Sequence, residues 1–285
     1  MLSLDGRSLD GRVVLVTGAT AGVGREITLR LASRGATVVA CARSAEPLAE
    51  LAEASPRIVA RACDVSSDHD RAALVAQTVA DQGRIDVLIN NLGIGWTGLV
   101  EDMTVDQIRR LVEVNVVGLI DLTRLALPHM LARGEGDVVI VASAASWFAA
   151  PPLTVYSATK YAVTGFAEGL RREVLTRGIR VHTVHPGLVA TEFSGRSAGA
   201  EPGEVGSTPS PGPGFPPGWV AASVERCLTR PWHDAVAVPR VLGLTRVVKL
   251  PLLRQAADLL VAANARRIAR LGEQTAEADA GAGVR

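Results

Sequence analysis

Tyr156 and Lys160 are the residues of this chain best suited to acid–base chemistry. They lie four positions apart in a proline-free segment, and Ser143 lies thirteen residues upstream of the tyrosine. On a helix, residues i and i+4 share one face, so the ammonium can approach the phenol. A phenol has a pKa near ~10, and an ammonium about 4 Å away at an effective dielectric of about 20 favours its ionised form by about 4 kcal/mol. The spacing therefore predicts a tyrosine that exchanges a proton near neutral pH, although such a pair also arises by chance on many helices.

A glycine-rich turn near the start of the chain is the second chemical signal. The apolar run 12–17 predicts a strand buried on both faces, and helical periodicity follows the turn as far as Gly35. Glycines let a ligand approach the backbone closely, and the free N–H groups of a helix N-terminus bind pyrophosphate. A tight turn without a ligand is the alternative. The candidate ligand contacts are Gly18, Thr20, Ala21, Gly22, Val23 and Gly24.

The Thr-Gly-x-x-x-Gly-x-Gly spacing from Thr17 to Gly24, together with Ser143 and the Tyr-x-x-x-Lys pair, resembles the short-chain dehydrogenase/reductase family. Further stretches match that family in the same order, so that the resemblance covers about residues 9–193. Leu92 departs from the family pattern, which has alanine there, and its larger side chain is expected to alter local packing. The further matches are Asp64, Val65, Asn90, Asn91, Leu92, Gly93, Asn115, Pro186, Gly187, Val189 and Thr191.

The resemblance implies hydride transfer between a nicotinamide cofactor and a carbonyl or alcohol substrate. Tyr156 would then move the proton, Lys160 would lower the tyrosine pKa and bind the nicotinamide ribose, and Ser143 would hold the substrate oxygen. Asn115 would anchor a water relay to the lysine. The resemblance also assigns Asp64 and Val65 to the adenine ring, the turn 91–93 to the cofactor ribose and the loop 186–191 to the nicotinamide end.

The end of the second predicted strand bears on the choice of cofactor. An acidic residue there would bind a free ribose 2′-hydroxyl, but Ala42 occupies the expected position and Arg43 follows it. A guanidinium pairs well with phosphate. The sequence therefore favours NADP(H) over NAD(H), although Ala21 stands where some NADP-preferring family members carry a second basic residue.

The remaining pattern predicts an α/β fold with a doubly wound, mostly seven-stranded parallel sheet of the Rossmann type and helices on both faces. In such sheets ligands bind beyond the carboxyl ends of the strands, which is where Gly18, Asp64, Asn90, Ser143 and Pro186 all fall. The predicted strands lie near 12–17, 36–41, 57–62, 86–90, 137–142, 180–185 and 235–239. The predicted helices lie near 22–33, 45–54, 67–82, 104–132, 154–177 and 219–229.

Composition narrows the class of protein. The net charge of +1 gives no support to nucleic-acid binding. Three cysteines without Cys-x-x-Cys spacing favour a reduced, cytoplasmic location, and the five histidines lack metal-ligand spacing, so no metal is expected. The stretch 138–159 carries no charge, but Pro151 and Pro152 interrupt it, and a strand, a loop and a helix start explain it better than a membrane span.

We expect residues 1–240 to form one cofactor-binding catalytic domain. Within it, the Gly/Pro/Ser-rich stretch 194–218 predicts a flexible loop, either a lid over the substrate or a tolerated insertion. Residues 241–271 form a basic amphipathic pattern interrupted by Pro251, suited to packing, to subunit contact or to peripheral contact with a membrane surface. Residues 272–285 are expected to be a disordered tail.

The sequence thus predicts an NADP(H)-dependent oxidoreductase that interconverts a carbonyl and an alcohol on a lipophilic small molecule. The family resemblance implies a homodimer or homotetramer. Trp96, Trp147 and Phe148 suggest an apolar pocket wall, with core packing as the alternative. Two other functions stay open: a non-catalytic, cofactor-binding regulatory protein, and an epimerase or dehydratase on the same fold.

Overall fold

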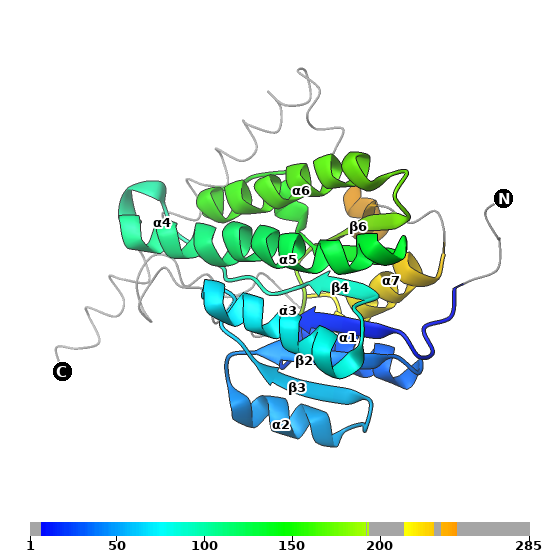
Figure 1. Cartoon of the computed structure of the whole chain (residues 1–285). Helices are drawn as coiled ribbons and strands as arrows, with labels where there is room; N and C mark the ends of the chain where they lie inside the picture. The colour runs from blue at the N-terminus through cyan, green and yellow to red at the C-terminus, as the bar shows by residue number, and fades with distance from the viewer. Residues whose placement is uncertain (1–6, 192, 194–213, 231–234, 244–285) are drawn as a thin grey trace.

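A single parallel sheet organises the chain (Figure 1). The computed structural model describes residues 7–191, 193, 214–230 and 235–243, and within them seven strands pair in the order β3-β2-β1-β4-β5-β6-β7. Every pairing is parallel, which confirms the predicted fold class. The strands are β1 (Val13–Thr17), β2 (Thr37–Ala42), β3 (Ile58–Ala62), β4 (Val87–Asn90), β5 (Gly136–Val141), β6 (Ile179–Pro186) and β7 (Ala235–Val238).

Helices cover both faces of the sheet, which explains why the central strands β1 and β4 are almost wholly apolar and fully buried. Successive residues of β1 alternate between the two cores: Val14 and Val16 face one, Val13 and Leu15 the other. The first core is closed by α1 (Gly22–Ser33), α2 (Ala45–Glu53) and α7 (Pro217–Thr229). The second is closed by α3 (Asp68–Gln82), α5 (Gly118–Arg133) and α6 (Thr154–Val174).

Local sequence sets several helix ends. The Ser67 side chain accepts a hydrogen bond from the Asp70 backbone at the start of α3, and Gly83 ends that helix with a φ of 76° that favours glycine. Thr104 and Gln107 form a reciprocal capping box at the start of α4 (Val105–Val112). These caps satisfy backbone groups that a helix terminus leaves unpaired.

The predicted helix 104–132 is helical from Val105 to Arg133, but it is not α-helical throughout. A π-helical turn, η2 (Glu113–Val117), separates α4 from α5 and contains Asn115. Both polar atoms of the Asn115 side chain hydrogen-bond to the backbone of Ile94, at 2.8 and 2.9 Å. A π turn widens the helix by one residue, and such turns are frequent at functional sites. Periodicity in the sequence does not reveal it.

The uncharged stretch 138–159 runs from strand β5 through the short helix η3 (Ala144–Ser146) and a loop into α6, as expected. Among the described residues, no helix is both long and apolar enough to cross a membrane. The predicted flexible loop lies largely, and the C-terminal extension and tail almost wholly, outside the described residues. The remaining short helix is η1 (Val100–Asp102).

Strand order decides where a ligand can lie. The chain winds outward in one direction from β1 to β3, and in the other direction from β4 to β7. The loops that follow β1 and β4 therefore diverge at the carboxyl edge of the sheet and leave a crevice between them. The glycine turn follows β1 and the Asn90–Gly93 turn follows β4, so two of the predicted motifs border this crevice.

Candidate active site

The glycine turn after β1 leaves the N-terminus of helix α1 open. Gly18 has a φ of 65°, and a Cβ on Gly24 would lie 2.0 Å from the Gly18 carbonyl oxygen, so a side chain at Gly24 would clash with the turn. Ala21 caps the helix without a side-chain hydrogen bond, and the first turn of α1 contains no acidic residue. The free N–H groups and the helix dipole suit an anion, so these residues fit the pyrophosphate of a dinucleotide.

Thr17 joins this turn to the one that follows β4. Its hydroxyl oxygen accepts hydrogen bonds from the backbone nitrogens of Asn91 and Leu92, at 3.1 and 3.0 Å. In return, the Asn91 side chain donates to the carbonyl oxygens of Thr17 and Gly18, at 3.0 and 3.3 Å. The two turns are therefore fixed relative to each other. Thr17 is a site residue beyond those predicted, and its place at the start of the glycine motif is the sequence signal that points to it.

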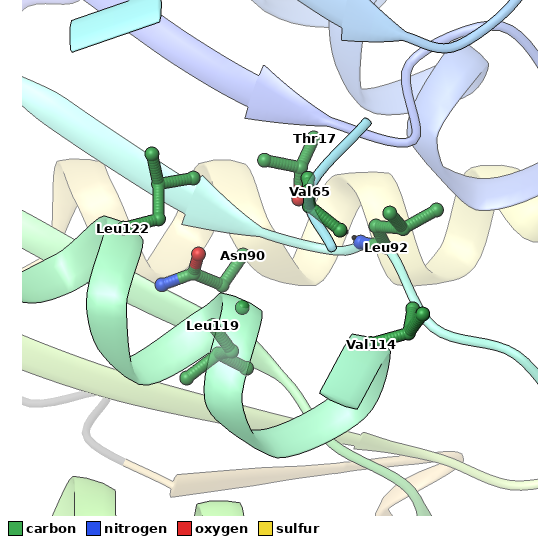
Figure 2. A pocket seen from close by; sticks show the side chains of 8 residues that line it. Thr17, Val65, Asn90, Leu92, Val114, Leu119 and Leu122 are labelled. Atoms are coloured by element: carbon green, nitrogen blue, oxygen red, sulfur yellow. Dashed lines mark hydrogen bonds between the residues drawn. The ribbon is translucent and has the colours of Figure 1, made fainter. Parts of the chain in front are cut away.

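Leu92, the departure from the family pattern, packs inward. It is half-buried against the second core and lines a small cavity of about 10 Å³. Figure 2 shows the lining side chains, which come from β1, β4 and the residues that follow β3 and β4, from the π turn η2 and from the start of α5. A cavity of this size holds at most about one water molecule. The larger side chain is accommodated by core packing, and the backbone of the turn keeps its hydrogen bonds to Thr17.

The ends of β2 and β3 carry the residues predicted for the adenosine end of the cofactor. The Asp64 carboxylate accepts hydrogen bonds from the backbone and hydroxyl of Ser66, at 2.9 and 2.7 Å, and lies 3.8 Å from the Arg110 guanidinium. Burial opposes ionisation, but the Ser66 bonds and the charges of Arg110 and Arg43 outweigh it and lower the pKa of Asp64. Arg43 is exposed at this edge, where its guanidinium is accessible to a phosphate. Val65 is buried beneath it.

The loop after β6 returns to the glycine turn. A Cβ placed on Gly22 would lie 2.9 Å from Cγ2 of Thr191, so the two loops are in contact. Gly187 donates its backbone N–H to Val238 of β7, at 2.9 Å, and Val189 pairs with Phe215 in an isolated parallel bridge. The loop 186–191 thus closes the crevice on the side away from the ends of β2 and β3.

Tyr156 and Lys160 lie on the buried face of α6, with side chains pointing toward the end of β5. Tyr156 is 7% exposed and Lys160 is 4% exposed, and the lysine Nζ lies 5.7 Å from the centre of the phenol ring. Lys160 donates a long hydrogen bond of 3.5 Å to the Val141 carbonyl oxygen. The i, i+4 spacing therefore brings the two groups to one face, as the sequence predicted.

The pKa values of this pair differ from the sequence-based expectation. Burial raises the pKa of Tyr156 to about 12, and a hydrogen bond with the Ser143 side chain offsets only part of this rise. Burial also lowers the pKa of Lys160 to about 8, so the lysine charge itself is disfavoured in this environment. The expected lowering of the tyrosine pKa by the lysine is therefore absent here: desolvation of the phenol dominates, and the hydrogen bond with Ser143 is what opposes it.

Asn115 ties the π turn to both the β4 loop and α6. Besides its two bonds to Ile94, its Nδ2 donates to the Thr159 hydroxyl at 3.1 Å, and that hydroxyl donates to the Tyr156 carbonyl oxygen at 2.7 Å. Gly93 lies in the same place: a Cβ there would be 3.1 Å from the Lys160 Nζ and 3.3 Å from the Asn115 Oδ1. The absence of a side chain at Gly93 leaves room between the lysine and the asparagine.

The tryptophans that were expected to form an apolar pocket wall lie in the core instead. Trp96 is buried in an apolar cluster with Met103, Leu111 and Tyr156, while the ring of Trp147 stacks on His185. Both tryptophans are therefore core packing, the alternative stated for them. Phe193 instead faces the phenol, with ring centres 6.0 Å apart, and it is 39% exposed. No motif pointed to Phe193.

The structure thus brings all the predicted site residues to the carboxyl edge of the sheet and the helix ends that border it. They lie on the β1, β4, β5 and β6 loops, the β2 and β3 ends, the π turn and α6. In the described part of the chain, no three His, Cys, Asp or Glu side chains are grouped as metal ligands.

Comparisons with known proteins agree with this geometry. The family model described as short chain dehydrogenase matches residues 12–201. A putative ketoacyl reductase of Streptomyces coelicolor is 39% identical over 191 residues, which are 65% of this chain and 73% of the relative. The chain spans between 18% and 73% of the length of the first curated relatives.

Solved structures share the fold. A short-chain dehydrogenase from Streptomyces avermitilis superposes with a TM-score of 0.77 at 32% identity, covering 90% of this chain and 98% of that one. A 3-ketoacyl-(acyl-carrier-protein) reductase from Brucella melitensis, solved in complex with NADH, gives a TM-score of 0.73 at 29% identity over 81% and 98% of the two chains. The matched family, the parallel sheet and the ordered motifs together lead to one conclusion: this chain belongs to the short-chain dehydrogenase family of oxidoreductases.

Proposed function

We propose that this protein is an NADP(H)-dependent oxidoreductase that interconverts a carbonyl and an alcohol on a lipophilic small molecule. The observation that carries the proposal is the buried pair Tyr156 and Lys160, with the half-buried Ser143 hydrogen-bonded to the phenol. A buried phenol and ammonium with no catalytic task would be costly to maintain, because each loses its hydration.

Tyr156 is the proton donor when the substrate carbonyl is reduced. With a pKa raised to about 12, the phenol keeps its proton at neutral pH, which is the form that reduction requires. The bound nicotinamide supplies the hydride, and the residues of the chain orient the two reactants and handle the proton. Ser143, hydrogen-bonded to the phenol, is placed to hold the same substrate oxygen that receives the proton.

Lys160 and Asn115 support the tyrosine. The lysine Nζ lies on the same side of α6 as the phenol and next to Gly93, where a ribose hydroxyl would fit. Asn115 holds the Ile94 backbone and the Thr159 hydroxyl, and thereby fixes the β4 loop against the catalytic helix. A water chain from the lysine past Asn115 would return the proton to solvent.

The preference for NADP(H) rests on Arg43. Its exposed guanidinium stands at the end of β2, next to Ala42, which cannot bind or repel a ribose 2′ group. Asp64, a carboxylate on the same edge, is already engaged by Ser66 and Arg110. A 2′-phosphate would therefore meet a cation rather than an anion. The relative solved with NADH makes NAD(H) the alternative to be tested.

The preference for a lipophilic substrate rests on the surroundings of the phenol. Phe193 faces Tyr156, and Leu153, Val155 and Ala145 pack around the same cluster. Apolar walls with a few polar groups are usual for small-molecule sites. We also propose a cytoplasmic homodimer or homotetramer, with the C-terminal extension available for subunit or peripheral membrane contact.

The test combines cofactor binding with turnover. NADPH and NADH are titrated by fluorescence into wild-type protein, Arg43→Ala and Tyr156→Phe. NADPH oxidation is then followed with a panel of carbonyl probes: a bicyclic ketone, a long-chain 3-oxo thioester and a steroid ketone. We expect NADPH binding that weakens about tenfold or more in Arg43→Ala, because a bidentate guanidinium–phosphate pair is lost. Tyr156→Phe should bind NADPH normally and lose turnover.

Three outcomes would overturn parts of the proposal. Tighter binding of NADH that Arg43→Ala leaves unchanged would reverse the cofactor assignment. Cofactor binding without turnover of any probe would favour the regulatory function. Conversion of substrate without net loss of NADPH would favour an epimerase or dehydratase.

A further inference from the structure

The backbone carbonyl of Ser143 is held by two buried side chains that no motif identifies. The Ser146 hydroxyl donates to the Ser143 carbonyl oxygen at 2.5 Å, and Nδ1 of His185 lies 2.8 Å from the Ser146 oxygen. The same Nδ1 is 3.3 Å from the Ser143 carbonyl oxygen. Ser146 is 1% exposed and His185 is fully buried, so solvent cannot replace these bonds.

Counting protons fixes the tautomer of His185. A carbonyl oxygen can only accept, so the single hydroxyl proton of Ser146 is used in the bond to Ser143. The contact between the Ser146 oxygen and His185 is then a hydrogen bond only if Nδ1 carries a proton and donates it. The 3.3 Å contact from Nδ1 to the Ser143 carbonyl oxygen is consistent with the same donor. His185 is therefore protonated at Nδ1 and cannot act as a base toward Ser146.

The cluster connects two elements that meet at the active site, η3 and β6. Ser146 ends η3, which follows Ser143 directly, and His185 lies on β6 immediately before Pro186. The Trp147 ring stacks on His185 with centres 4.0 Å apart and an angle of 27° between planes, which restricts rotation of the imidazole. The position of the imidazole is thus set by packing as well as by hydrogen bonding.

Fixing the Ser143 carbonyl also fixes its hydroxyl. Ser143 is extended, with φ −168° and ψ 157°, and its oxygen accepts from the Ala145 backbone nitrogen at 3.1 Å. With the carbonyl held on one side and the hydroxyl on the other, the residue has little freedom to rotate away from the phenol. The Ser146 backbone N–H also donates to the Ser143 carbonyl oxygen, at 3.0 Å, so loss of a side-chain support should shift the residue without releasing the loop.

We propose that Ser146 and His185 are positioning residues for the reaction, which orient Ser143 toward Tyr156 and the substrate oxygen. This rests on the proposed function, because it assigns them a role in the same transition state. Neither residue touches the reacting atoms. Their effect should therefore appear in kcat with a carbonyl substrate, and should be small in the affinity for NADPH. A misplacement of about 1 Å can lower a rate a hundredfold.

The test uses variants that differ in where they place an N–H group. His185→Asn carries an amide nitrogen near the position of Nδ1, whereas His185→Gln carries the same amide one methylene farther out, near Nε2. Ser146→Ala removes the bridging hydroxyl. Ser157→Ala is the matched control, since Ser157 is also fully buried beside Tyr156, but its hydroxyl has no hydrogen-bond partner among the described residues. Steady-state kinetics use NADPH and the carbonyl probe that wild-type protein reduces fastest.

We expect His185→Gln and Ser146→Ala to lower kcat by about tenfold to a hundredfold, with the KM for NADPH changed by less than about threefold. His185→Asn should recover most of the wild-type kcat, and Ser157→Ala should match wild type within about twofold. Equal losses in the Asn and Gln variants, or a loss confined to NADPH affinity, would overturn the positioning role. Wild type inactive with every probe would instead overturn the proposed function, and the catalytic role of the cluster with it.

A second measurement does not depend on turnover. In wild-type protein labelled with ¹⁵N-histidine, the His185 signals, assigned with His185→Asn, should show a protonated Nδ1 and an unprotonated Nε2. This result supports the cluster even where Ser146→Ala or His185→Gln fails to fold. An unprotonated Nδ1 in the neutral imidazole would break the hydrogen-bond pattern on which the proposal is built, and would overturn it whatever the kinetics show.

Discussion

Because Lys160 is buried, its positive charge should measurably lower the free energy of unfolding. Its pKa falls from an ordinary 10.5 to about 8 in the folded protein. At ~1.36 kcal/mol per unit, this difference corresponds to about 3 kcal/mol. The folded state disfavours the ammonium, so the unfolded chain binds more protons between these two pKa values, and stability contributed by this group rises with pH across that window. Below pH 8 the full penalty is present, and above pH 10.5 it disappears.

Replacing the lysine by an uncharged side chain of similar length removes this penalty. Lys160→Met should raise the free energy of unfolding by about 2–3 kcal/mol at pH 7, after allowance for about 1 kcal/mol or less from the long bond to Val141. At pH 10 the gain should shrink by about 2.5 kcal/mol, because most of the wild-type penalty has already gone. The variant should be inactive in turnover at both pH values, so the substitution should increase stability and abolish activity.

Denaturant unfolding of both proteins at pH 7 and pH 10 measures the stability difference. The pKa itself is accessible because the chain has only two lysines, Lys160 and Lys249. With ¹³C-labelled lysine side chains, two signals titrate, and Lys249→Arg identifies which belongs to Lys160. We expect one midpoint at about 8. Two midpoints near ~10.4, or a Lys160→Met variant that is less stable than wild type at pH 7, would refute the burial argument.

Three further predictions concern Gly24 in the glycine turn, Asp137 at the start of β5, and Phe193, which faces the phenol of Tyr156. Gly24→Ala should weaken NADPH binding at least tenfold in a fluorescence titration, since its Cβ would lie 2.0 Å from the Gly18 carbonyl oxygen; unchanged affinity would show that the turn can relax. Asp137 is fully buried, and although burial opposes ionisation, cationic partners hold its pKa well below the usual range. The stability it contributes is present above its unfolded pKa of about 4 and is lost as pH falls below that. Asp137→Asn should therefore lower the free energy of unfolding by about 3–5 kcal/mol at pH 7, and the difference from wild type should narrow at pH 3 in denaturant titrations; a constant difference would contradict this. Phe193→Ala should raise the KM for apolar carbonyl probes several-fold without changing NADPH affinity, because the wall facing Tyr156 is removed; equal effects on polar and apolar probes would argue against a substrate contact.

Much of the fold is predictable because its signals are local. Short apolar runs rich in β-branched residues, such as 13–17, favour strands buried on both faces, and their alternation with helical periodicity leaves few topologies other than a doubly wound parallel sheet. The spacing of Tyr156 and Lys160 predicts one helix face, and their pairing there is observed. The long helix through Asn115 was predicted without its π turn, since the hydrogen bonds to Ile94 that accompany the turn join residues far apart in the sequence.

The sequence by itself determined which residues reach the carboxyl edge of the sheet, because strand ends and motif spacing are properties of short segments. Only the tertiary structure decided how deeply these residues are buried, which groups they contact and how their pKa values shift. The pKa of Tyr156 rises rather than falls, since desolvation depends on everything packed around the phenol. Likewise Thr17, Phe193, Ser146 and His185 join the site through contacts that the folded chain alone creates.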